Sequence, residues 1–291
     1  MHPAASVIVF TSLSGLGFGL MFWLGFGYPS VTGWSAFAYY FVAFGLAVTG
    51  LLASTLHLGR PARAINAFSQ WRSSWLSREG VAAVATLIVV GLYAAGLIFL
   101  GFDIKPLGWL GALMALGTVF TTSKIYNQLK TVPRWNMALV PPLFLTYALA
   151  GGALLAGQAV AASALLLLLS VLQMAAWQIG DGAFGRAGHT LGTATGLSAL
   201  GEMRLLESPH SGPNYLMREM VHVIGRKHAM KLRAIALVTL GLLPAALLIL
   251  LPLNYATAGL AVASHVVGLF VSRWLFFAEA EHVVGLYYGK R

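Results

Sequence analysis

Charge is scarce in this chain, and cysteine is absent. Lys, Arg, Asp and Glu together make up 9% of the 291 residues, while 58% of the residues are hydrophobic. A soluble domain needs a larger polar share than this, so the composition predicts an integral membrane protein. Without cysteine the protein forms no disulfide and supplies no thiolate to zinc or to an iron–sulfur cluster. Any iron–sulfur chemistry must therefore belong to a partner.

Long apolar runs predict the fold. A helix needs about 20 apolar residues to cross a bilayer, and the runs do not alternate as barrel strands would. We therefore expect an all-α integral membrane protein, one domain over residues 1–291, with a retained first helix. The expected transmembrane helices are 5–27, 34–57, 80–101, 107–127, 137–157, 159–179, 233–252 and 256–277. Glycines such as Gly15, Gly19, Gly108 and Gly111 either permit close helix packing or only reflect composition.

Basic residues lie almost entirely on one side of these spans. The 2–3, 4–5 and 6–7 loop regions and the C-terminus carry Arg60, Arg63, Arg72, Arg78, Lys124, Lys130, Arg134, Arg186, Arg204, Arg218, Arg226, Lys227, Lys231, Arg233, Lys290 and Arg291. The other side carries Lys105. The positive-inside rule therefore predicts that both termini are cytoplasmic. Anionic lipid or an acidic docking partner would each explain this basic face.

The 6–7 loop, residues 180–232, is the one large segment expected outside the membrane. Leu216, Met220 and Ile224 recur every four residues, which predicts an amphipathic helix over 215–228. Such a helix would lie on the membrane surface or against a partner. The loop is too short for a domain with its own core.

A polar hairpin lies between spans 2 and 3. His57 falls in the last turn of span 2 and Glu79 opens span 3, with four arginines between them. Ionisable groups at a membrane edge usually face a bundle interior or a site. His57 is either an interfacial histidine bonded to a carbonyl or a hydrogen-bond partner of a redox ligand. Glu79 is either a helix-terminal acid favoured by the macrodipole or a proton acceptor.

Further polar residues fall at the same membrane face. Tyr126 and Asn127 close span 4 and Arg273 closes span 8, as interfacial residues or as a pocket edge. A bis-His haem would need two histidines at matched depth on facing helices. His265 is the one histidine deep within a span, so no haem is expected. A secondary transporter would place its site near the midplane, where this cluster does not lie.

Several of these segments resemble one family. They are the run from Leu56 to Asn66, the run from Leu76 to Glu79, Ile125-Tyr126-Asn127 followed by residues 131–135, and Arg273 with Phe276 and Phe277. They are similar to the membrane anchor subunit of dimethyl sulfoxide reductase, over nearly the whole sequence. The resemblance implies that this protein anchors an iron–sulfur subunit and a molybdopterin catalytic subunit to the membrane. It also implies that the anchor itself exchanges electrons with quinone. It implies quinone contacts for His57 and Glu79, and Arg60, Arg63, Tyr126, Asn127 and Arg273 are further quinone-binding candidates.

The predicted orientation favours one branch of this family. The last, basic segment of the 6–7 loop, residues 226–233, resembles the membrane subunit of the cytoplasmically oriented sulfite dehydrogenase (quinone). We therefore expect sulfite oxidation with ubiquinone or menaquinone as acceptor, in the bacterial inner membrane. The iron–sulfur subunit would dock on the cytoplasmic face, and no nucleic acid is expected as a partner. A dimethyl sulfoxide or polysulfide type of reductase, oxidising quinol, is the alternative. Because the oxidation site and the quinone site would both lie on the cytoplasmic side, we expect turnover to separate no charge across the membrane.

Overall fold

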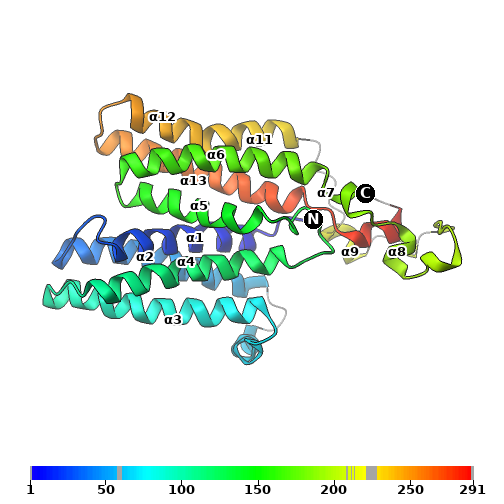
Figure 1. Cartoon of the computed structure of the whole chain (residues 1–291), viewed down its shortest axis with the longest axis horizontal. Helices are drawn as coiled ribbons and strands as arrows, with labels where there is room; N and C mark the ends of the chain where they lie inside the picture. Colours follow the sequence, from blue (N-terminus) through cyan, green and yellow to red (C-terminus); the bar gives the residue numbers. More distant parts are fainter. Residues whose placement is uncertain are drawn as a thin grey trace.

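The computed structural model describes residues 2–57, 61–207, 209–210, 212, 214–220 and 228–289. These residues form helices and loops without a strand. Eight helical rods lie roughly antiparallel, and Figure 1 shows them stacked from α3 at one side of the bundle to α11 and α12 at the other. The all-α prediction is confirmed for the described part of the protein.

The rods follow the predicted segments closely. They are α1 (Ala5–Gly25), α2 (Gly33–Ala53), α3 (Trp75–Ala95), α4 (Lys105–Asn127), α5 (Val140–Leu155), α6 (Ala159–Asp181), α11 with α12 (Ala229–Leu237 and Leu243–Leu250) and α13 (Tyr255–Ala278). Two π-helical turns, η3 (Gly96–Leu100) and η5 (Val238–Leu242), extend α3 and join α11 to α12.

Six of the rods are long and apolar enough to cross a membrane. The six do not include α4, which carries Lys105 and Lys124 near its ends, or the 16-residue α5. Crossing by all eight rods therefore stays a prediction. Among the helix starts, the largest difference from the prediction is at α3, which begins at Trp75 and not at residue 80. Glu79 consequently lies inside the helix and not at its opening.

Helix α1 is the centre of the bundle and packs against α2, α4 and α5. Gly19 of α1 and Gly152 of α5 lie backbone to backbone, so a Cβ on Gly19 would collide with the carbonyl of Ala148. Close approach of this kind replaces the hydrophobic drive that water supplies to soluble bundles. Gly15, in contrast, faces open space.

The loops that follow α2, α4 and α6, which we call the even-numbered loops, gather with both marked ends of the polypeptide at one end of the bundle (Figure 1). We call it the basic end, and it comprises the described parts of 54–79, 124–139, 180–232 and 279–289. It includes the short helices η1 (Ser54–His57) and η2 (Pro61–Gln70). The loops between α1 and α2, α3 and α4, α5 and α6, and α12 and α13 form the opposite end. The grouping agrees with the predicted topology, while the side of the membrane stays a prediction.

A small cap extends beyond the basic end, on the right of Figure 1. It contains α7 (Ala183–Ala187), α8 (Leu191–Thr195), η4 (Ser198–Leu200), α9 (Tyr215–Glu219) and the C-terminal η6 (Val283–Tyr288). The Tyr287 hydroxyl donates to the Ala194 carbonyl at 2.5 Å, and the Asn214 amide donates to the Tyr288 hydroxyl at 3.0 Å. The C-terminal segment is thereby tied to the 6–7 loop. Of the helix predicted over 215–228, the part at 221–227 lies outside the described residues.

His282 begins this C-terminal segment. Its Nδ1 accepts a hydrogen bond from the Val284 amide at 2.9 Å. Partial burial lowers the pKa of His282 below its usual value, because the charged imidazolium is poorly solvated there. The neutral ring keeps the lone pair that accepts this bond.

Candidate functional site

The start of α3 is held by Ser74 and by Arg78 of the hairpin. Ser74 caps the helix by accepting from the Ser77 amide. Arg78 stacks over the Trp75 ring at 4.4 Å and donates to the carbonyls of Trp71 and Arg72, at 3.0 and 2.6 Å. Arg78 is therefore a structural clamp on the hairpin. The clamp fixes where the next turn of α3, which carries Glu79, enters the bundle.

Three of the predicted site residues fall outside what can be described. Arg60 lies outside the described residues. The backbone of His57 ends η1 and that of Arg63 lies in η2, while their side chains are outside the description. Their predicted roles as quinone contacts stay predictions.

Glu79 is buried against α4. Its side chain faces Thr122, whose hydroxyl donates to Glu79 Oε1 at 3.3 Å, and the residue is 5% exposed. The same hydroxyl also donates to the Thr118 carbonyl at 3.0 Å, so the carboxyl has a shared and long hydrogen bond. A buried carboxyl is costly unless it is well paired. A carboxyl held in this way is suited to exchanging a proton.

Tyr126 lies near the end of α4, within electrostatic range of Glu79 and of Arg273. Its ring lies in an aromatic cage of Trp135, Phe144, Phe276 and Phe277, with ring centroids 5.4–5.9 Å apart. Its hydroxyl lies within electrostatic range of both Arg273 and Glu79. The pocket edge expected at Tyr126 stays a prediction.

Arg273 is a buried cation without an acid partner among the residues that the structure describes. It is 3% exposed, and its guanidinium stacks on the rings of Phe144 and Tyr147 at 3.9 and 4.3 Å. Its Nε is fully buried and has no acceptor among those residues. Stacking on aromatic faces offsets part of the cost of burying the charge. The N–H groups of the guanidinium remain available to a ligand.

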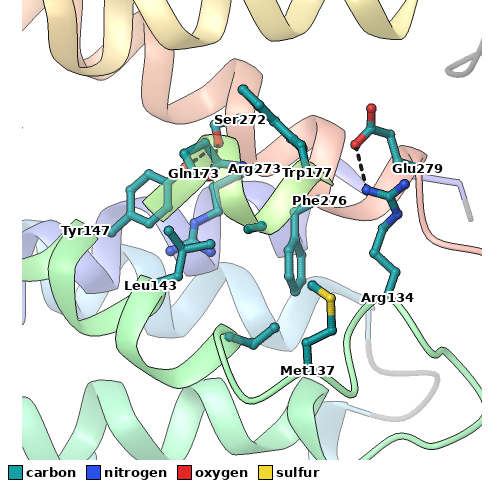
Figure 2. A pocket seen from close by; sticks show the side chains of 12 residues that line it. Arg134, Met137, Leu143, Tyr147, Gln173, Trp177, Ser272, Arg273, Phe276 and Glu279 are labelled. Atoms are coloured by element: carbon teal, nitrogen blue, oxygen red, sulfur yellow. Dashed lines mark hydrogen bonds and ion pairs between the residues drawn. The ribbon is translucent and has the colours of Figure 1, made fainter. Parts of the chain in front are cut away.

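A small internal cavity of about 30 Å³ lies beside Arg273 (Figure 2). Its polar wall comes from three helices: the Tyr147 hydroxyl donates to Gln173 Oε1 at 2.6 Å, Ser272 donates to the same oxygen at 3.2 Å, and Tyr147 and Ser272 also contact each other. Leu143, Trp177 and Phe276 supply apolar wall. The cavity is large enough for one or two waters and too small for a quinone ring.

A ring of four charges closes the basic end above this cavity. Arg134 pairs with Asp181 at 2.5 Å and with Glu279 at 3.3 Å, and Arg233 pairs with the same two acids at 2.5 and 2.7 Å. The ring joins the 4–5 loop to the ends of α6 and α13 and to the start of the α11–α12 rod. Arg134 and Glu279 also line the cavity (Figure 2). Arg273 lines the same cavity and is not part of this ring.

Asn127 braces the 4–5 loop. Its amide nitrogen donates to the Met137 carbonyl at 2.8 Å and to the Trp135 carbonyl at 3.4 Å, and its oxygen accepts from Lys124 at 2.8 Å. With these groups engaged, Asn127 positions the loop and its aromatic residues around Tyr126.

His265 has a packing role in this structure. Its Nδ1 donates to the Leu240 carbonyl at 2.7 Å, in the π-helical turn η5, and the residue is 1% exposed. Its Nε2 faces Gly151 across a tight contact. Among the described residues no group of three or more His, Asp or Glu side chains is placed to hold a metal ion.

The structure thus brings Glu79, Tyr126 and Arg273 together and adds residues that sequence reasoning missed. Thr122, Tyr147 and Ser272 give no distinctive sequence signal, because hydroxyls are common in membrane helices. Gln173 carried a usable signal, since an amide within the apolar run of α6 needs a partner. The charge ring carried none, because its members are far apart in sequence.

Comparisons with known proteins show the family of this protein. The sequence profile described as "DMSO reductase anchor subunit (DmsC)" matches residues 1–289. The protein is 31% identical to the C subunit of sulfite dehydrogenase from Allochromatium vinosum, over 99% of both sequences. It is 35% identical to the C chain of anaerobic dimethyl sulfoxide reductase from Escherichia coli, over 36% of this protein and 38% of the relative. No solved structure matches the sequence. This membrane protein therefore belongs to the DMSO reductase anchor subunit family.

Proposed function

We propose that the protein is the quinone-binding membrane anchor of a three-subunit molybdopterin and iron–sulfur oxidoreductase that passes electrons from sulfite to quinone. Similarity to the C subunit of sulfite dehydrogenase extends over nearly the whole of both proteins. Similarity to the dimethyl sulfoxide reductase relative extends over little more than a third of each. This difference in coverage favours the sulfite-oxidising branch.

One observation carries the site. Glu79, Tyr126 and Arg273 converge from α3, α4 and α13 at the basic end, and all three are buried. The Arg273 Nε donor has no acceptor in the described part of the protein. An oxygen of a quinone ring would accept from this guanidinium, and the Tyr126 hydroxyl is a second donor within its electrostatic range, so these groups suit such a ligand.

Each residue has a separable role in this proposal. A bound quinone supplies the two-electron acceptor. His57 and Tyr126 hold its oxygens, and Glu79 exchanges protons with it. Arg273, with Arg60 and Arg63 on the hairpin, offsets negative charge on the reduced ligand. Asn127 acts indirectly, because its amide is spent on holding the 4–5 loop.

The basic end is the proposed docking face for the iron–sulfur subunit, with the molybdopterin subunit beyond it. The cap exposes Leu200 and Leu206 beside Arg204, outside the apolar rods. Exposed leucines next to positive charge suit an acidic protein surface with an apolar centre. We place this face in the cytoplasm of a bacterial inner membrane, because the basic loops gather there.

The dimethyl sulfoxide reductase relatives support a second candidate, an anchor that oxidises quinol. The two candidates use the same quinone site and differ in the partner's substrate. Purified complex that oxidises sulfite with a soluble quinone favours the first. Complex that reduces dimethyl sulfoxide with a quinol, and leaves sulfite unchanged, favours the second.

The site is tested on the complex in membranes with Glu79→Gln and His57→Ala. We expect quinone-linked turnover to fall by about 100-fold or more, the usual size of lost proton-transfer catalysis. Dye-linked sulfite oxidation by the soluble subunits should survive. Arg72→Gln, an exposed hairpin change, is the control. Normal quinone turnover in both site variants would refute the proposed site.

A further inference from the structure

The cavity beside Arg273 is lined by this proposed quinone-binding residue and by Arg134 and Glu279 of the charge ring at the basic end. Reduction of a quinone to a quinol takes up two protons with two electrons, so a buried quinone site needs a route for protons. Glu79 is 5% exposed, and its one described partner is the Thr122 hydroxyl. The carboxyl therefore needs a further group to reach solvent.

The unsatisfied groups around the cavity point to bound water. A buried guanidinium without an acceptor costs free energy unless something accepts its hydrogen bonds. A polar cavity of more than about 10–15 Å³ with two to four partners holds a water. This cavity of about 30 Å³ offers the donors of Arg273 with Gln173, Ser272, Tyr147 and Glu279.

Charged side chains connect the cavity to the surface. Glu279 lines it and pairs with Arg134 and Arg233, which both reach Asp181. The Asp181 side chain is 49% exposed at the basic end. In Figure 2 the side chains run from Tyr147 and Gln173, past Arg273 and Phe276, to the Arg134–Glu279 pair.

Arg273 connects the cavity to the proposed site, because it lines the cavity and is one of the proposed quinone-binding residues. Arg273 lies within electrostatic range of Tyr126, which is within range of Glu79. Ion pairs and the cavity lining join exposed Asp181 to Arg273, and electrostatic coupling extends from Arg273 through Tyr126 to Glu79. The apolar cage around Tyr126 keeps this line narrow.

We propose that this cavity holds ordered water and is the proton route between the quinone site and the surface of the basic end. Water hydrogen-bonded to Arg273, Gln173, Ser272 and Tyr147 carries protons between the Glu279 end and Tyr126, and Glu79 exchanges them with quinone. Arg273 keeps its own protons and orients the water. The proposal rests on the proposed function, and it assigns positioning roles to Gln173 and Ser272.

The test uses the whole complex with Gln173→Leu and Ser272→Ala, each assayed with a soluble quinone. We expect quinone-linked kcat to fall about tenfold or more, with an unchanged KM for quinone and unchanged dye-linked sulfite oxidation. The solvent deuterium isotope effect on kcat should rise, and a small diffusible buffer such as imidazole should restore part of the rate. A purely structural role for these residues would not give that rescue.

Ser264→Ala is the matched control for Ser272→Ala, since Ser264 lies about two turns earlier on α13 and does not line the cavity. It should leave kcat and the isotope effect unchanged. Wild-type kcat and isotope effect in Gln173→Leu and Ser272→Ala, with Glu79→Gln inactive, would overturn the route and leave the quinone site standing. Should Gln173→Leu fail to assemble, the milder Ser272→Ala decides by the same readouts.

Discussion

At the scale of the residue, Arg273 is the most informative side chain. Its charge is held by two aromatic faces instead of a carboxylate. Burying a charge without an acid partner lowers stability, and replacing such groups by apolar ones of similar size is often neutral or stabilising. We therefore interpret Arg273 as a ligand-binding group and not as a stabilising one.

This difference gives a prediction for Arg273→Met. The thermal midpoint of the complex in detergent should stay unchanged or rise, while quinone-linked kcat/KM falls about 10- to 150-fold, equivalent to about 1.5–3 kcal/mol for a lost charged hydrogen bond. Arg78→Met removes the hairpin clamp, so it should lower the thermal midpoint and leave quinone-linked kcat/KM much less affected. Loss of stability in Arg273→Met without loss of turnover would contradict the assignment.

Asn127 is predicted to act through structure. Asn127→Ala removes hydrogen bonds to two loop carbonyls and should lower the free energy of unfolding by about 1–2 kcal/mol. The KM for quinone should change little, because the amide is already engaged. Gln128→Ala, at an exposed neighbour, is the comparison. A large rise in KM at wild-type stability would show direct contact with quinone instead.

At the scale of the element, the contact between α1 and α5 sets how closely the rods pack. Gly19→Ala should destabilise the anchor by about 1–3 kcal/mol or more, because the added methyl meets the Ala148 backbone. Gly15→Ala lies four residues earlier on the same helix and faces open space. Thermal unfolding of the two variants in the same detergent should differ clearly, and equal midpoints would refute the packing role.

The charge ring should respond unevenly to neutralisation. Glu279→Gln leaves two partly buried guanidinium groups without a full partner and should cost about 3–5 kcal/mol. Asp181→Asn removes a half-exposed charge and should cost about 0–1 kcal/mol. The measurement is the thermal midpoint of the complex at low and at high salt. A larger loss for Asp181→Asn would mean that the ring is stabilised from its solvent side.

At the scale of the whole molecule, apolar run length was enough to find the eight rods, and the lopsided basic residues were enough to predict that the even-numbered loops share an end. Helix bounds were less accessible. The polar segment before Glu79 looks like loop, yet capping by Ser74 and stacking on Trp75 start α3 at residue 75. The Gln173–Tyr147–Ser272 cluster depends on how three helices rotate against one another, which one-dimensional patterns do not encode.

The orientation is testable because the protein has no cysteine. Single substitutions at exposed Ser198, in the cap, and exposed Ser30, at the opposite end, supply one thiol each. In intact cells a membrane-impermeant maleimide should label Ser30→Cys and spare Ser198→Cys until the membrane is opened. The reverse pattern would place the basic end outside the cytoplasm.

The π-helical turn η5 fixes the rotational register between the two halves of the seventh rod. A π turn holds one more residue than an α turn, and each residue of an α-helix rotates the backbone by about 100°. Deleting one residue from Val238–Leu242 would thus swing everything before it around the axis, carrying Arg233 away from Asp181 and Glu279 and withdrawing the carbonyl that meets His265. The π-helical turn thus sets the rotation of α11 relative to α12. Relatives that lack it would have to form both the Arg233 ion pairs and the His265 hydrogen bond in another way.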